Sequence, residues 1–265
     1  REAADEDGIR DILQEDQTEN QNLPPMSSRI NIPTVANFRR VGAREAGGAL
    51  RNLYRSDHLG ALDDADAREI AALGITRVLD FRGVQERAAA VCRLPGVAVH
   101  SLPIEPTIVQ KLGALLAAGQ RLSPADITAH MQDTYRGFVR HNTARFADFF
   151  AHLLASGEPT VFHCTAGKDR TGFAAALLLK AVGASDEEVM HDYLLTNERL
   201  VLPQESRLGL SREAMVVLWR VQPEFLRAAF EEVDRSYGSL EAYFRTGLAL
   251  GPRERERLHA LYRES

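Results

Sequence analysis

One short segment of this chain specifies a strand, a loop and a helix in succession. Residues 160–172 read TVFHCTAGKDRTG. The run Thr160–Phe162 is typical of a strand, Gly167 marks a loop, and the apolar run Phe173–Val182 predicts a helix. A loop that opens a helix in this way presents backbone N–H groups and the positive end of the helix dipole to an anion. The segment therefore predicts an α/β fold with an anion-binding loop.

Two side chains of this loop suit phosphoryl transfer. Cys164 follows the predicted strand, where the positive field of the loop favours the thiolate, the nucleophilic form of the side chain. Arg170 comes six residues later, and its planar guanidinium stays charged and binds two phosphoryl oxygens at once. The pair predicts that Cys164 attacks phosphorus while Arg170 holds the equatorial oxygens.

Neighbouring residues are expected to assist. The hydroxyl of Thr171 is suited to donate a hydrogen bond to the sulfur when a thiophosphate breaks down, although threonine is also common in a first helical turn. His163, directly before the cysteine, is expected to support it. A buried structural cysteine beside a helix cap would explain Cys164 but not the rest of the segment. The predicted phosphate-binding residues are Thr165, Ala166, Gly167, Lys168, Asp169 and Arg170.

A phosphatase of this type also needs a carboxylic acid that protonates the leaving oxygen and later activates water. Asp80 follows the predicted strand 75–79, and the carboxyl ends of parallel strands converge on the ligand crevice of an α/β sheet. We therefore expect Asp80 to be the general acid, with Asp169 inside the loop as the alternative. The plainer explanation for Asp169 is a first-turn carboxylate that interacts favourably with the helix dipole. The other candidates considered are Asp126, Asp133 and Asp148.

The composition of the chain limits its domain number, its location and the kinds of partner to expect. The chain has 265 residues, 45% of them hydrophobic, which is enough for one large domain, and its net charge of −5 gives no reason to expect nucleic-acid binding. Its two cysteines, Cys92 and Cys164, indicate a reducing compartment, so we expect a cytoplasmic protein, with export by an unconventional route left open. No apolar stretch is long enough for a membrane span, and no metal-ligand spacing is present. We expect chemistry without a metal or cofactor; the oligomeric state is not indicated.

The chain divides into an extension and a domain. Residues 1–29 are acidic and rich in amides, and they are either a native, disordered extension or sequence upstream of a true start at Met26. From residue 30 to residue 265, short apolar runs alternate with helical periods, which predicts one catalytic domain. Residues 142–156 give the clearest helical pattern, with a phenylalanine-rich core face.

Residues 104–140 stand out as an insertion between a predicted strand and that helix. An apolar run is followed by Ser123 and Pro124, an N-cap and first-turn pair, so two helices are expected. A helical pair near a phosphate pocket can act as a lid, whereas packing on the sheet is the plainer alternative.

Several segments resemble the PtpB-like group of atypical bacterial protein tyrosine phosphatases. The central one is the loop from His163 to Gly172, in which His-Cys is followed by five residues and Arg-Thr. The others, in the same order along the chain, are Asn37-Phe38-Arg39, Leu53-Tyr54-Arg55-Ser56, Leu73-Gly74-Ile75-Thr76, Asp80-Phe81-Arg82, Asp192-Tyr193-Leu194 with Thr196-Asn197, and Tyr237-Gly238-Ser239-Leu240.

The resemblance implies a tyrosine-phosphatase-like central sheet flanked by helices, and hydrolysis of phosphate monoesters through a phosphocysteine. It implies that Asp80 is the general acid and that residues 104–140 form a helical lid. The implied substrates are phosphotyrosine and, in addition, phosphoserine, phosphothreonine and phosphoinositides. A lysine in the loop, here Lys168, recurs in members of the family that accept phosphoinositides, although an exposed lysine at a helix start is the plainer explanation.

Three other functions share parts of this pattern. A rhodanese-type sulfurtransferase also has a cysteine loop between a strand and a helix, but such loops usually bring the cation closer than six positions. A pseudophosphatase would use the same loop to bind a phosphate group but would not hydrolyse it. Reversible oxidation of Cys164, with or without pairing to Cys92, is compatible with an active phosphatase.

Overall fold

The computed structural model describes residues 30, 32–42, 48–206 and 208–263. All elements reported below belong to the compact unit Asn31–Ser265. The predicted extension 1–29 lies outside the described residues.

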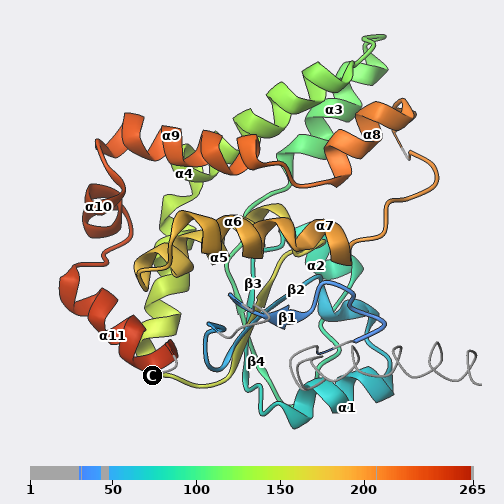
Figure 1. Ribbon diagram of the computed structural model, residues 1–265. Coiled ribbons are helices and arrows are strands. Elements are labelled where there is room, and N and C mark those ends of the chain that lie inside the picture. Colours follow the sequence, from blue (N-terminus) through green and yellow to red (C-terminus); the bar gives the residue numbers. More distant parts are fainter. Residues whose placement is uncertain (1–29, 31, 43–47, 207, 264–265) are drawn as a thin grey trace, which may run out of the picture. The chain divides into compact units, whose positions relative to one another are not determined.

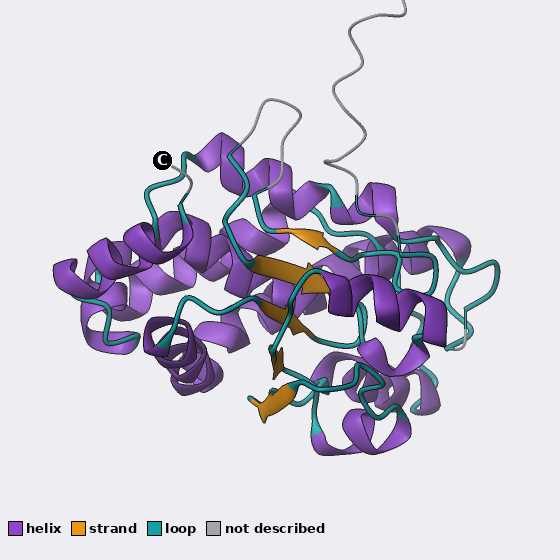
Figure 2. Ribbon diagram, turned by 90° about the horizontal axis from the view of Figure 1, so that it is seen from below, coloured by secondary structure: helices purple, strands orange, loops and turns teal. Residues whose placement is uncertain are grey.

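A five-stranded mixed sheet forms the centre of this unit, with helices on both sides (Figures 1 and 2). The strand order is β1-β2-β5-β3-β4, in which β1 is antiparallel to β2 and all other neighbours are parallel. This arrangement confirms the predicted fold class, and it puts β5, which leads into Cys164, in the middle. The strands are β1 Arg39–Arg40, β2 Leu53–Ser56, β3 Arg77–Asp80, β4 Ala98–Ser101 and β5 Thr160–His163.

Helices take up most of the remaining chain. Before the central strand they are α1 Asp64–Ala72, α2 Val84–Ala89, α3 Thr107–Ala117 and α4 Pro124–Ala155. After it they are α5 Asp169–Ala181, α6 Asp186–Leu194, α7 Thr196–Arg199, α8 Arg212–Trp219, α9 Pro223–Tyr237, α10 Leu240–Ala242 and α11 Pro252–Tyr262, with short irregular turns of helix at Leu59–Ala61 and Tyr243–Gly247.

The helix α4 is longer than the sequence pattern indicates. Its start is as expected, because the Ser123 side chain accepts from the N–H of Asp126 and the Asp126 carboxylate accepts from the N–H of Ser123. The helix then continues through residues 142–156, which the sequence suggested as a separate helix. Thr143 stays within it because its hydroxyl donates to the carbonyl of Val139 at 2.7 Å. One helix of 32 residues therefore runs from the insertion into the core.

The core lies between the sheet, α4 and α5. Phe149 of α4 contacts Phe162 of β5 and Phe81 after β3, with ring centroids 5.0 and 5.5 Å apart. The helix α5 is buried along nearly its whole length, which fits its continuous run of alanine and leucine. The strand β5 and the helix α5 are thus held on both sides, and the loop between them has fixed ends.

No helix within the described ranges is long and apolar enough to cross a membrane.

Removal of a core ring should destabilise the whole domain. We expect Phe149→Ala to lower the free energy of unfolding by about 3–5 kcal/mol, because it leaves a cavity among packed rings. The control is Asp148→Ala, which changes the neighbouring residue of α4, whose side chain is exposed. We expect it to change the free energy of unfolding by no more than about 0.5 kcal/mol. Urea denaturation measures both, and equal effects would contradict the core assigned to α4.

Candidate active site

The predicted anion loop joins β5 to α5 at the carboxyl edge of the sheet. The ends of the two neighbouring strands flank it, since Ser56 of β2 and Asp80 of β3 both pair with His163. Gly167 has a positive φ of 63°, and a Cβ on it would overlap the carbonyl of Ser56. Only glycine combines this backbone conformation with such a close approach to a neighbouring strand.

The carbonyl groups of the loop are held from outside. The N–H of His58 donates to the carbonyl of Thr165 at 3.0 Å, and the amide of Asn37 donates to the carbonyls of Ala166 and Gly167 at 2.9 Å each. Because the N–H across a trans peptide points opposite to its C=O, these contacts turn the following N–H groups toward the concave side of the loop. This arrangement suits the loop to act as a cradle that binds an anion with backbone amides.

A buried charge cluster supports the cradle from behind. Arg55 donates to the carbonyl of Gly167 at 2.9 Å and forms an ion pair with Asp192 of α6. Arg39 donates to the backbone carbonyl of Asp192 at 3.0 Å and to the hydroxyl of Thr196 at 3.1 Å. Burial alone would raise the pKa of Asp192, but the two arginines outweigh it and keep the pKa below its usual value. The carboxylate is thus ionised and ties α6 to the strand under the loop.

Cys164 is buried at the bottom of this loop, with 2% of its surface exposed. Its carbonyl lies 3.0 Å from Nδ1 of His163, so that nitrogen carries the ring proton. Burial lowers the pKa of His163 to about 4, which leaves the ring neutral at neutral pH. His163 therefore supports the backbone of the cysteine and adds no charge near the sulfur.

Arg170 is fixed by a carboxylate that the sequence did not reveal. Glu86 of α2 accepts from both terminal nitrogens of Arg170, at 2.7 and 2.9 Å, and the carbonyl of Ile104 accepts at 2.9 Å. Burial by itself would lower the pKa of the guanidinium, but Glu86 and the nearby Cys164 raise it. In turn, burial would raise the pKa of Glu86, but Arg170 lowers it to about 2. Glu86 binds one edge of the guanidinium, which leaves the Nε edge for two-point binding of an oxyanion.

Glu86 was missed because another role explains it. Its carboxylate also accepts from the N–H of Gly83 at 2.8 Å, as a residue in the first turn of a helix does. A second contact, with the hydroxyl of Thr165, links it to the loop. From the sequence alone, a glutamate in the first turn of a helix indicates no more than such a capping role.

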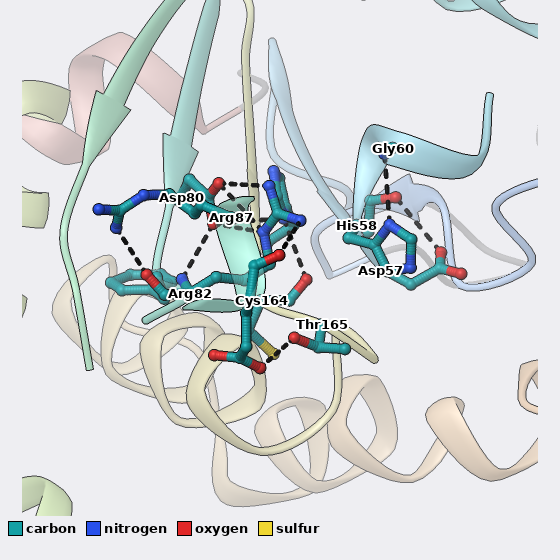
Figure 3. A network of polar contacts seen from close by, with 12 residues as sticks. Asp57, His58, Gly60, Asp80, Arg82, Arg87, Cys164 and Thr165 are labelled. Carbon is teal, nitrogen blue, oxygen red and sulfur yellow. Dashed lines mark hydrogen bonds and ion pairs between the residues drawn. The ribbon is translucent and has the colours of Figure 1, made fainter. Parts of the chain in front are cut away.

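Asp80 lies at the expected edge, but its carboxylate is committed to Arg82. Arg82 donates to both carboxylate oxygens through its side chain, at 2.7–3.1 Å, and also through its backbone N–H at 2.9 Å. Burial would raise the pKa of Asp80, but these contacts outweigh it and the pKa is lowered. Figure 3 shows this pair beside Cys164 and Thr165. A buried carboxylate held ionised in this way does not favour the role of proton donor.

Asp169 is the more accessible of the two predicted acids. It opens α5, and its side chain is 23% exposed. Its Oδ1 accepts from the hydroxyl of Tyr135 in α4 at 2.9 Å, and its Oδ2 lies 3.2 Å from Nζ of Lys168. Tyr135 is a further residue at the site that the sequence analysis did not single out.

Lys168 and Thr171 have contrasting surroundings. The ammonium of Lys168 is mostly buried and donates to the carbonyl of Leu218 in α8 at 2.7 Å. It is not the exposed helix-start lysine of the plainer interpretation. The hydroxyl of Thr171 is buried and has no hydrogen-bond partner among the described residues. An unpaired buried hydroxyl is costly, which is consistent with a partner that is present only during the reaction.

The remaining candidate acids lie in other settings. Asp126 caps α4, Asp133 pairs with Lys111 and Arg140, and Asp148 pairs with Arg145. Among the described residues there is no group of His, Cys, Asp or Glu side chains arranged to hold a metal ion.

The predicted lid region contributes to both the core and the site. Tyr135 and Met131, from the first half of α4, are buried in the main hydrophobic cluster. Ile104, at the start of the insertion, supplies the carbonyl that binds Arg170. The part of α4 that follows Pro124 thus packs as a core helix, and a lid function for residues 104–140 stays a prediction.

Comparisons with known proteins identify the family of this chain. The sequence model of the tyrosine phosphatase family matches residues 30–264. A Cupriavidus necator protein provisionally named as a tyrosine-protein phosphatase is 34% identical over 234 residues, which cover 83% of this chain and 84% of that protein. The triple specificity protein phosphatase PtpB of Mycobacterium tuberculosis is 34% identical over 256 residues, which cover 81% and 92%. The chain belongs to the tyrosine phosphatase family.

This membership confirms the resemblance seen in the sequence and the predicted enzyme class, a hydrolase of the protein tyrosine phosphatase type. Among solved structures, the catalytic core of Siw14 aligns with 77% of this chain and 95% of its own length at 14% identity. Its TM-score of 0.33 is too low to carry an argument.

A side chain at Gly167 should disrupt the loop. We expect Gly167→Ala to lower kcat/KM by roughly a hundredfold or more, because the added Cβ would push the loop away from Ser56. The matched control is Gly238→Ala, which has φ of 83° but no atom within 4 Å of the added Cβ. Steady-state phosphate release measures both, and equal activities would contradict the close approach.

Loss of the Glu86 charge should misplace Arg170. We expect Glu86→Gln to reduce kcat/KM and to weaken inhibition by inorganic phosphate, each by about tenfold, because one of the two hydrogen bonds to Arg170 becomes a clash of donors. Because the pKa of Glu86 is lowered to about 2, its carboxylate is fully ionised throughout the neutral pH range. The size of the defect in Glu86→Gln should therefore not change with pH in that range. Glu158→Gln, which breaks an ion pair with Arg77 elsewhere, is the control. An unchanged phosphate inhibition constant would overturn the role of Glu86.

Proposed function

We propose that this hydrolase cleaves phosphate monoesters through a phosphocysteine on Cys164. The observation that carries the proposal is the cradle of backbone amides around a buried cysteine, beside an arginine that Glu86 holds with one edge available. The amides and Arg170 bind the three non-bridging oxygens, and the thiolate attacks phosphorus in line with the leaving oxygen.

Two steps complete the reaction. In the first, the bond between sulfur and phosphorus forms, the bond between phosphorus and the leaving oxygen breaks, and that oxygen takes a proton from a carboxylic acid. In the second, the resulting carboxylate takes a proton from water, the water oxygen bonds to phosphorus, and the sulfur leaves as thiolate. The unpaired hydroxyl of Thr171 is suited to donate a hydrogen bond to that thiolate.

We assign the acid to Asp169 in preference to Asp80, the first choice from the sequence. Asp169 is part of the loop and is partly exposed, whereas Asp80 is buried and both of its oxygens are bound to Arg82. A group that must gain and lose a proton in each turnover needs access to substrate and water. In this assignment Asp80 positions Arg82 and the turn after β3.

For the substrate, we propose phosphotyrosine in proteins, with phosphoserine, phosphothreonine and phosphoinositides as further members of the range. The family of the chain supports the first, and the name of the relative PtpB, a triple specificity protein phosphatase, supports a broader range. A phosphoinositide with a second phosphate would have to draw Lys168 away from the carbonyl of Leu218. A cytoplasmic location, expected from the cysteine content, stays a prediction.

The test is phosphate release by wild type and three variants on phosphotyrosine, phosphoserine and phosphothreonine peptides and on phosphoinositides. We expect no turnover by Cys164→Ser, a loss of about 10²–10⁴-fold in kcat by Asp169→Asn, and a smaller loss without a change in the pH–rate profile by Asp80→Asn. Trapping of a phosphorylated Cys164 by rapid quench would establish the intermediate.

Each alternative has its own signature in this experiment. Phosphopeptide binding without turnover by the wild type would favour a pseudophosphatase, and thiosulfate-dependent sulfur transfer without phosphate release would favour a rhodanese-type enzyme. Loss of the basic limb of the profile in Asp80→Asn would return the acid to Asp80.

A further inference from the structure

The carboxylate of Asp169 ends a chain of buried hydrogen bonds that the two steps above do not use. Its Oδ1 lies 2.9 Å from the hydroxyl of Tyr135, which lies 2.7 Å from the hydroxyl of Tyr193. Tyr135 comes from α4 and Tyr193 from α6, and both side chains are fully buried. Residues from three distant parts of the sequence thus meet at the predicted acid.

The chemistry of the three groups determines the direction of this chain. An ionised carboxylate has no proton to give, so the hydroxyl of Tyr135 donates to Asp169. With its single proton used, the oxygen of Tyr135 accepts from Tyr193. Burial, the largest cause, raises the pKa of both tyrosines well above its usual value, so both keep their protons wherever the enzyme works.

Packing fixes the positions of both hydroxyl groups. The ring of Tyr135 lies against Phe138 and Phe225, with ring centroids 5.1 and 5.9 Å away. The ring of Tyr193 lies over Gly172 of α5, where an added Cβ would be only 3.1 Å from the ring. The donor to Asp169 is therefore held by the core and does not have to be ordered in each turnover.

We propose that Tyr135 positions Asp169 so that Oδ2 is the oxygen that exchanges the proton with leaving group and water. The proposal rests on the assignment of Asp169 as the acid. Because Oδ1 accepts from Tyr135 in both protonation states, the acidic proton resides on Oδ2. Oδ2 gives it up as the bond from phosphorus to the leaving oxygen breaks, and takes one from water in the second step. Tyr135 undergoes no chemistry itself.

Other charged groups also act on this carboxylate. Lys168 lies 3.2 Å from Oδ2, and Arg170 is attracted to Asp169 from the next position in α5. Arg55 and Glu224 influence Tyr193 with opposite sign. The test therefore leaves both cations in place and changes only the hydroxyl of Tyr135.

The decisive variant is Tyr135→Phe, which removes one oxygen and keeps the packed ring. On a phosphotyrosine peptide we expect kcat to fall about tenfold with KM nearly unchanged, because the acid is no longer held in place. On an aryl phosphate whose leaving group needs no proton, the loss should be much smaller. Tyr193→Phe should show the same changes with a smaller size.

Two further variants separate the positioning of Asp169 from a general structural effect of losing a buried hydroxyl. Tyr243→Phe removes a buried hydroxyl that lies 3.2 Å from the hydroxyl of Thr143 in α4, the helix that also carries Tyr135, and it should leave the leaving-group dependence unchanged. In the Asp169→Asn background, Tyr135→Phe should add no further loss of kcat.

The outcomes distinguish this proposal from the one on which it rests. If Asp169→Asn leaves the leaving-group dependence intact, Asp169 is not the acid and the role of Tyr135 falls with it. If Asp169→Asn abolishes that dependence while Tyr135→Phe behaves like Tyr243→Phe, only the positioning role is overturned.

Discussion

The hydrogen bonds that turn the loop carbonyls outward are the constraint on which this site depends. Asn37, Arg55 and the backbone of His58 hold three successive carbonyls, and all three residues lie within positions 37–58, in or near β1 and β2. Without them, the peptide units after Cys164 are free to turn, and their N–H groups no longer converge on one point. The N-terminal part of the domain thus supplies the shape of a site whose reactive side chains all come later in the sequence.

Buried charge is the second organising principle, and around the loop each buried carboxylate is paired with an arginine. Asp192 binds two arginines, Asp80 binds Arg82, and Glu86 binds Arg170. A buried arginine without a partner would be strongly destabilising, so these pairs arise together with the fold. Each pair also orients an element at the carboxyl edge of the sheet. Stability and the geometry of the anion site are therefore hard to separate by mutation of these residues.

Local signals were sufficient to predict the fold class and the strand–loop–helix succession, because strand, glycine turn and helix follow each other within residues 160–182. The same signals did not predict which side chains would bind to one another. Asp80 was placed at the correct sheet edge, but nothing in the sequence showed that Arg82 would bind both of its oxygens. Glu86 and Tyr135 were not singled out, because their contacts with Arg170 and Asp169 join residues that lie 84 and 34 positions apart in the sequence. The continuous α4 was divided because polar residues at 142 and 143 resemble a boundary, although they bond back to the helix.

Gly167 has a consequence for how such a loop can change or be transferred. Its contact with Ser56 leaves no room for a side chain, so the loop fits one particular neighbouring strand and not a sheet edge in general. Residues 160–172 grafted onto another parallel sheet would carry Cys164 and Arg170 but not the contacts with β2 and Asn37 that shape the loop. The loop is thus not a portable motif, because its conformation depends on the backbone of β2 and on the amide of Asn37 as well as on its own residues.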